Sequence, residues 1–92
     1  MKENKNYQVV LRNKELFIKD PLPDNIDITK VFSFVEKSIP NHLLYVIDAF
    51  YVGQFKDLID YERAAVYRDG AIFITNSQTD NSDMIDDIVH EI

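Results

Sequence analysis

Apolar and polar positions near the start of the chain indicate two short strands and then a connection rich in helix breakers. Residues 7–12 (YQVVLR) and 15–19 (ELFIK) have the composition of strands, and Asn13-Lys14 between them suits a two-residue hairpin turn. Residues 20–25 (DPLPDN) carry two prolines and are predicted to be a connection. Two arrangements follow: residues 1–20 form a hairpin arm ahead of a domain over residues 21–92, or residues 1–92 form a single domain.

The middle of the chain predicts a helix and then a buried strand. Apolar residues recur at helical spacing over residues 28–38, Asp27 suits the N-cap and Pro40 ends the segment. Residues 43–52 (LLYVIDAFYV) are almost continuously apolar, as in a strand that is buried on both faces. The charge inside this run, Asp48, is predicted to pair with an arginine, Arg63 or Arg68, or to lie in a cleft. Residues 55–61 fit either a short helix or a loop.

The last third of the chain predicts a hairpin, a polar loop and a final helix. Residues 64–68 and 71–75 flank Asp69-Gly70, which is a strong signal for a hairpin turn. Residues 76–82 (NSQTDNS) read as a loop that provides a helix cap, either Asp80, Asn81 or Ser82. The fold class expected from these elements is α+β: a small mixed β-sheet with one packed helix and a C-terminal amphipathic helix.

The final helix has an apolar stripe with a histidine opposite it. At 100° per residue, the stripe spans an arc of about 140° and His90 lies roughly opposite its centre. The stripe consists of Met84, Ile85, Ile88, Val89 and Ile92. The sequence has no Gly, Asn or basic residue that would end this helix. We therefore expect that the chain has been cut within this helix, either by processing or because the 92 residues are part of a larger protein.

Composition narrows the classes of function. The formal net charge of −6 lies entirely in residues 69–92, because the ten acidic and ten basic residues before them balance. With no basic cluster, the chain is predicted to bind neither nucleic acid nor an anionic membrane. No apolar run approaches the roughly 18 residues of a membrane span. The absence of Cys and of a signal-like N-terminus fits a cytoplasmic or other intracellular location.

The segment Ile88-Val89-His90-Glu91-Ile92 resembles the first part of the H-E-x-x-H helix of zincin metallopeptidases. The order of elements before it is similar to that family as well: a helix, a buried strand, a hairpin whose second strand is the sheet edge, a polar loop and then the zinc helix. The resemblance covers roughly residues 28–92 and implies an incomplete zincin-like domain.

This resemblance implies roles for particular residues. His90 would be a zinc ligand, and Glu91 would be the general base acting on a zinc-bound water. The predicted edge strand would bind a peptide or protein substrate by β-augmentation, through Ala71, Ile72, Phe73, Ile74 and Thr75.

The motif is incomplete in these residues. The second His would fall two positions beyond Ile92, and the third ligand is missing too, so zinc is expected as a cofactor only if the motif is completed there. The chain alone is therefore predicted to be inactive as a peptidase.

The alternative function is that of a small acidic, non-catalytic protein-interaction module. Such a module could be an inhibitor, an assembly factor or a phage-type accessory protein, including one associated with the virion. If the chain is cut within the last helix, an exposed apolar face on that helix would also favour a homodimer.

Overall fold

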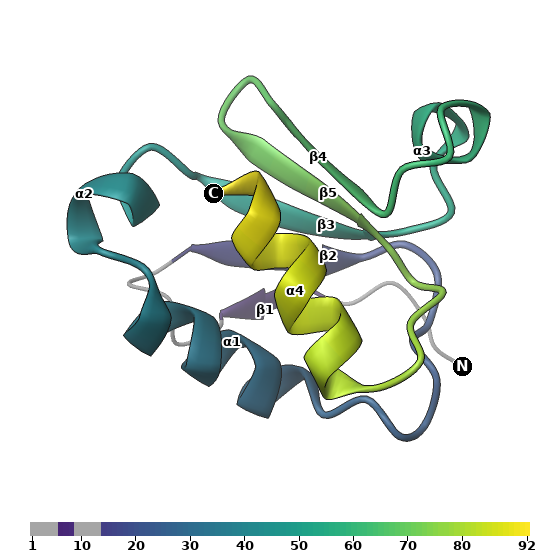
Figure 1. Cartoon of the computed structure of the whole chain (residues 1–92), viewed down its shortest axis with the longest axis horizontal. Helices are drawn as coiled ribbons and strands as arrows, with labels where there is room; N and C mark the ends of the chain where they lie inside the picture. Colours follow the sequence, from purple (N-terminus) through teal and green to yellow (C-terminus); the bar gives the residue numbers. More distant parts are fainter. Residues whose placement is uncertain (1–5, 9–13) are drawn as a thin grey trace.

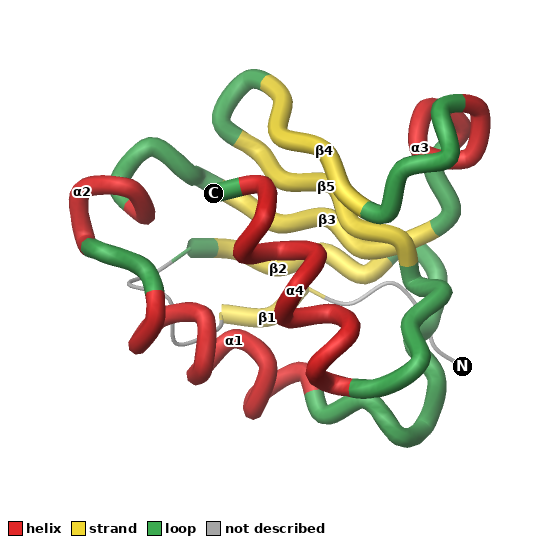
Figure 2. The backbone as a smooth tube through the Cα atoms, viewed as in Figure 1, coloured by secondary structure: helices red, strands yellow, loops and turns green. Residues whose placement is uncertain are grey.

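The computed structural model describes residues 6–8 and 14–92, with side chains from residue 14 onward. One mixed sheet is covered on one face by two helices, α1 (Ile28–Ser38) and α4 (Asn81–Glu91) (Figures 1 and 2). The strands lie in the order β1 (Asn6–Gln8), β2 (Glu15–Ile18), β3 (Ala49–Gly53), β5 (Ala71–Thr75) and β4 (Ala65–Arg68). The central strands β2, β3 and β5 are parallel, and β1 and β4 are antiparallel to their neighbours. This arrangement confirms the predicted α+β fold with a mixed sheet.

The first two strands pair in antiparallel fashion, as predicted, but in a different register. A two-residue turn at Asn13-Lys14 would place Arg12 opposite Glu15, whereas the residue opposite Glu15 is Gln8, so the predicted position of the turn is wrong. Residues 9–12 of the first predicted strand and Asn13 of the predicted turn lie outside the described residues. On its other side β2 pairs with β3, and Leu16 is fully buried in the core. Residues 15–18 therefore belong to the same sheet and core as the elements that follow them.

Helix α1 has the predicted bounds and the predicted cap. The Asp27 side chain accepts a hydrogen bond from the Lys30 backbone N–H (3.2 Å), which satisfies one of the free amides at the start of the helix. Val31, Phe32 and Val35 share one helical face and are fully buried against the sheet.

The prediction of one strand over residues 43–52 is wrong for its first half. A short helix, α2 (Asn41–Leu44), follows Pro40, and the strand begins only at Ala49. Asp48 explains the boundary, because an unpaired carboxylate is costly inside a buried strand and here it is exposed just before β3. Its predicted arginine partners pair elsewhere: Arg63 with Glu91 and Arg68 with Asp57. Residues 55–61, which the sequence left open, contain the short helix α3 (Lys56–Asp60).

The second hairpin is confirmed, but the position of its strands in the sheet is not. Asp69 and Gly70 both have positive φ (53° and 85°), as a two-residue turn of type I′ requires. However, β5 pairs with β3 on one side and with β4 on the other. The prediction that Ala71–Thr75 is the sheet edge is therefore wrong, and the first strand of the hairpin, β4, is the edge.

The core lies between the sheet and the two helices. Phe32 of α1 meets Phe50 of β3 edge-to-face, with ring centroids 4.8 Å apart, and both are fully buried. On α4, Met84 and Ile88 are fully buried, and Ile85 and Ile92 pack against the same core. Two residues of the apolar stripe of the last helix are thus buried in the domain core, and Ile85, Val89 and Ile92 are partly buried. The homodimer through this helix stays a prediction. None of the helices in the described part of the chain has the length and apolar character needed to cross a membrane.

Candidate functional site

The C-terminal end of α4 and the start of β4 border a shallow hollow of about 200 Å³. Helix α4 begins at Asp80, whose side chain accepts a hydrogen bond from the Asp83 backbone N–H (2.9 Å), so one of the three predicted caps is confirmed. The helix packs on α1, β4 and β5, which places its last turn beside the edge strand. The hollow is lined by Arg63, Ala64, Ala65, Asp87, His90 and Glu91.

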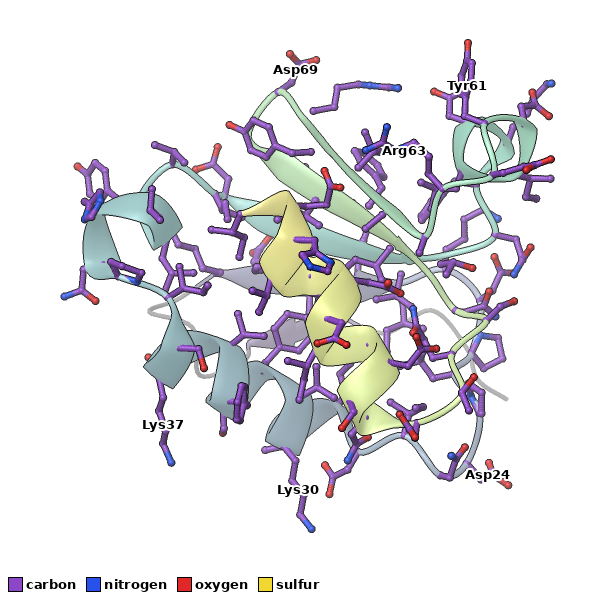
Figure 3. The ribbon with its side chains drawn as sticks, in the orientation of Figure 1. Asp24, Lys30, Lys37, Tyr61, Arg63 and Asp69 are labelled. Atoms are coloured by element: carbon purple, nitrogen blue, oxygen red, sulfur yellow. The ribbon has the colours of Figure 1, made fainter. Side chains whose placement is uncertain are left out.

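Both residues of the His-Glu pair line this hollow, but they differ in their surroundings. His90 is exposed, as its place opposite the apolar stripe predicts. The Glu91 side chain is only 20% exposed, and its Oε2 lies 3.3 Å from Arg63 Nη2. Arg63 lies two residues before β4, among the side chains near the end of α4 in Figure 3. The ion pair therefore joins the last turn of α4 to the segment that leads into the edge strand.

Asp87 lies one helical turn before Glu91, and its position raises the pKa of its carboxyl group. Partial burial raises its pKa above the ordinary value of 3.8, and the neighbouring charges of Asp83 and Asp86 add to this effect. A hydrogen bond from Gln78 Nε2 (3.0 Å) and the proximity of His90 act in the opposite direction. The Asp87 carboxylate therefore loses its charge at a higher pH than an exposed aspartate does.

Gln78 was not predicted to have a role, because it lies in a segment that the sequence identified only as a polar loop. Its side chain is 6% exposed, and Nε2 also donates to the Thr75 carbonyl (2.9 Å). It thus links the end of β5 to α4. Its Oε1 is buried without a hydrogen-bond partner among the described residues.

The residues present do not form a complete zinc site. Across residues 6–8 and 14–92 there is no group of three His, Cys, Asp or Glu side chains placed to hold a metal ion. A catalytic zinc needs three protein ligands and an open position. His90 can supply one imidazole, and Glu91 is engaged by Arg63, so the described residues alone do not support a metal-dependent step.

The edge strand beside this hollow leaves backbone groups unpaired by any other strand in the described part of the chain. Ala64 lies opposite Thr75, and the Thr75 N–H donates a hydrogen bond to the Ala64 carbonyl (2.8 Å), so these two residues form a hydrogen-bonded pair of the antiparallel ladder. Such pairs alternate along an antiparallel ladder, so Val66 and Arg68 turn their N–H and C=O groups toward β5, and Ala65 and Tyr67 turn theirs away. Tyr67 is 42% exposed, whereas Ala65 is buried beside the hollow. The accessible part of the edge is therefore at Tyr67.

The substrate-binding role predicted for Ala71, Ile72, Phe73, Ile74 and Thr75 does not fit this topology. Both sides of β5 are occupied by neighbouring strands, so a peptide has no free backbone to pair with. Burial in the structure distinguishes the two strands: β5 alternates regularly, whereas Tyr67 and Arg68 at the end of β4 are both exposed.

Comparisons with protein-family models, with curated proteins and with solved structures find no match for this chain.

Proposed function

We propose that these residues form the peptide-binding, N-terminal portion of a zinc-peptidase-like domain, with β4 as the edge that pairs with an extended peptide. The observation that carries the proposal is that His90 and Glu91 of α4 line the same hollow as the start of β4. A helix with a His-Glu pair beside an antiparallel edge strand supports the zincin resemblance, although the edge is the first strand of the hairpin and not the second.

Peptide binding at β4 follows from the chemistry of a free sheet edge. An added strand would take hydrogen bonds from the outward backbone groups of β4, chiefly those of Tyr67. Successive side chains of such a strand point to opposite faces of the sheet. Those on the helix side would lie over the hollow that contains His90, which is where a bound peptide would meet the end of α4.

Hydrolysis is proposed only for a form that has further ligands. The described residues supply one imidazole, and a second His two positions after Ile92 together with a third ligand would complete the zinc site. In that form His90 would be the first ligand and Glu91 would be the general base, and Glu91 would have to give up its contact with Arg63 to act in that role. An intracellular location remains part of the same proposal.

The coding sequence beyond Ile92 and a zinc titration test the metal role together. A product extended through the motif is expected to bind zinc, and His90→Ala should weaken that binding at least tenfold. His42→Ala is the matched control, since His42 is an exposed histidine on α2, and it should leave zinc binding unchanged. A stop codon directly after Ile92, or equal zinc binding in the His90→Ala variant, contradicts the metal role.

A non-catalytic interaction module is the second candidate, and one observation favours it. The face of the sheet opposite α1 and α4 carries a row of aromatic rings that ends in a hollow of its own. That surface does not depend on any residue beyond Ile92.

A further inference from the structure

The face of the sheet opposite α1 and α4 carries three stacked aromatic rings, one from each of three neighbouring strands. The register places Phe17 of β2 opposite Tyr51 of β3, and Tyr51 opposite Phe73 of β5. Both successive ring pairs have centroids 5.0 Å apart, with interplanar angles of 14° and 13°. Within the row, the ring faces are turned toward one another, so among the described side chains a further ring can stack only at one of the two ends of the row.

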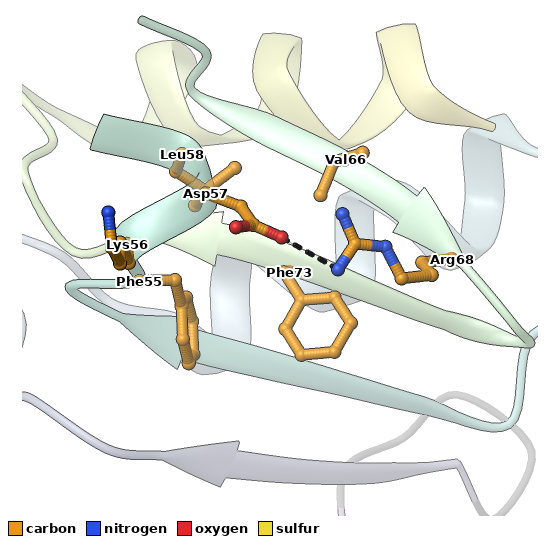
Figure 4. Close-up of a pocket in the computed structure, with 7 residues that line it drawn as sticks. All are labelled: Phe55, Lys56, Asp57, Leu58, Val66, Arg68 and Phe73. Carbon is orange, nitrogen blue, oxygen red and sulfur yellow. Dashed lines mark ion pairs between the residues drawn. The ribbon is translucent and has the colours of Figure 1, made fainter. Parts of the chain in front are cut away.

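The row ends at β4, where the residue opposite Phe73 is Val66. Valine is too small to continue a row of rings, and a hollow of about 210 Å³ adjoins this position. Phe55 borders the hollow, with its ring nearly perpendicular to that of Phe73 (86°, centroids 5.3 Å apart). Figure 4 shows the lining residues, which are Phe55, Lys56, Asp57, Leu58, Val66, Arg68 and Phe73.

The charged side chains that line this hollow have a net positive charge, whereas the whole chain is negatively charged. Two cations, Lys56 and Arg68, line it together with one anion, Asp57, although the chain has a net charge of −6. Arg68 Nη1 lies 2.8 Å from Asp57 Oδ2, and both side chains are about half exposed (52% and 50%), so water weakens this ion pair (Figure 4). The guanidinium is therefore accessible to a competing carboxylate.

We propose that this hollow docks a single aromatic side chain of a partner protein, with a carboxylate next to it that binds Arg68. Its volume lies below the roughly 300–1,000 Å³ of pockets for drug-sized ligands, so it suits one side chain rather than a cofactor. A phenyl ring there continues the row beyond Phe73 and meets the edge of Phe55. A buried aromatic anchor beside an arginine is the usual composition of a binding hot spot.

This site goes beyond the peptide edge proposed above, because it lies on the opposite face of the sheet from the hollow of His90 and Glu91. A nucleobase with its phosphate would present similar chemistry. The observations favour a protein, since the ring faces within the row are already occupied by one another and do not offer the open stacking platform that successive bases use.

Peptide titrations followed by ¹H–¹⁵N NMR test the proposal. The probe Ac-Gly-Asp-Phe-Asp-Gly-NH₂ should shift the amide signals of Leu58, Val66 and Phe73. Replacing its Phe with Ala should abolish these shifts, and replacing its two Asp with Lys should weaken binding at least fivefold. Equal binding of the three peptides, shifts confined to another surface, or tighter binding of the hexanucleotide U₆ at the same signals overturns the proposal.

Variants of the protein separate the two parts of the site. Val66→Phe fills the end of the row and should abolish binding of the probe. Arg68→Glu should weaken binding of the probe at least fivefold and make the Lys-flanked peptide the preferred one. This variant tests the site even if Val66→Phe does not fold. Lys37→Glu is the charge-matched control on α1, remote from the hollow (Figure 3), and should bind as the unaltered protein does. Unchanged binding by Arg68→Glu, or an equal loss in Lys37→Glu, contradicts the role of Arg68.

Discussion

Arg63 and Glu91 form an ion pair that connects the two elements on which the proposed peptide site depends. Arg63 Nη2 lies 3.3 Å from Glu91 Oε2, and the carboxylate is the less exposed of the two groups (20% against 54%). The contact spans the hollow between the segment before β4 and the last turn of α4. It therefore helps to hold the His90-Glu91 end of the helix against the edge strand.

We predict that Glu91→Gln lowers the free energy of unfolding by no more than about 1 kcal/mol, because solvent reaches the arginine and weakens the pair. Urea unfolding of Glu91→Gln, Arg63→Gln and the double variant gives the coupling energy between the two side chains. A small favourable coupling is expected. If the two single effects simply add, the ion pair makes no contribution in solution.

Asp87→Asn should stabilise the protein at pH 7. Burial raises the pKa of the Asp87 carboxyl above 3.8, so its ionised form opposes folding at any pH above that raised pKa. This unfavourable effect on folding disappears as the pH falls through the raised pKa toward 3.8, since the protonated Asp87 carboxyl is uncharged, like the side-chain amide of the Asn variant. The stability difference between variant and parent, followed from pH 7 to pH 3, should therefore shrink on acidification. A difference that grows instead would show that the native environment favours the charged form.

The cap of α4 offers a test of the helix that carries His90. Asp80→Ala removes the acceptor for the Asp83 N–H and should cost about 1 kcal/mol, within the range of 0.5–2 kcal/mol typical of N-caps. Asp80→Asn keeps an acceptor oxygen and should cost much less. Thermal unfolding of both variants measures the difference, and equal losses would mean that charge rather than capping matters at this position.

Phe50 should matter far more than Phe34 for stability. Phe50 is fully buried against Phe32, so truncation to Ala is expected to cost about 3–5 kcal/mol. Phe34 lies on the same helix as Phe32 but is 53% exposed, and Phe34→Ala should change stability by less than about 1 kcal/mol. Denaturant unfolding of the two variants compares them directly, and similar losses would contradict the packing described for α1.

Local chemistry made several elements predictable from the sequence. Asp27 and Asp80 act as caps because their carboxylates accept from nearby amides, and neither interaction depends on the rest of the fold. Asp69-Gly70 forms its turn for the same reason, since both residues tolerate positive φ. The placement of His90 on the exposed side of α4 followed from helical periodicity alone.

Features set by tertiary pairing were not predictable in the same way. The apolar run before Ala49 looks like a strand, but Leu44 and Ile47 reach the core from a helical turn and a loop. The order of the two hairpin strands depends on which of them pairs with β3, and the hairpin sequence does not specify that. The aromatic row depends on the register between strands that are far apart in the chain, so Phe17 and Tyr51 gave no signal of their contact.

Hydrogen exchange at the edge strand tests the central claim most directly. The probe is a peptide selected on the protein from a random library without aromatic residues, which keeps it from depending on the hollow beside Phe73. Its addition should slow exchange of the Tyr67 amide at least tenfold and leave Val66 and Arg68 unchanged, because their amides already point toward β5. Protection confined to other parts of the sheet, with Tyr67 exchanging as in the free protein, would contradict a peptide-binding edge at β4.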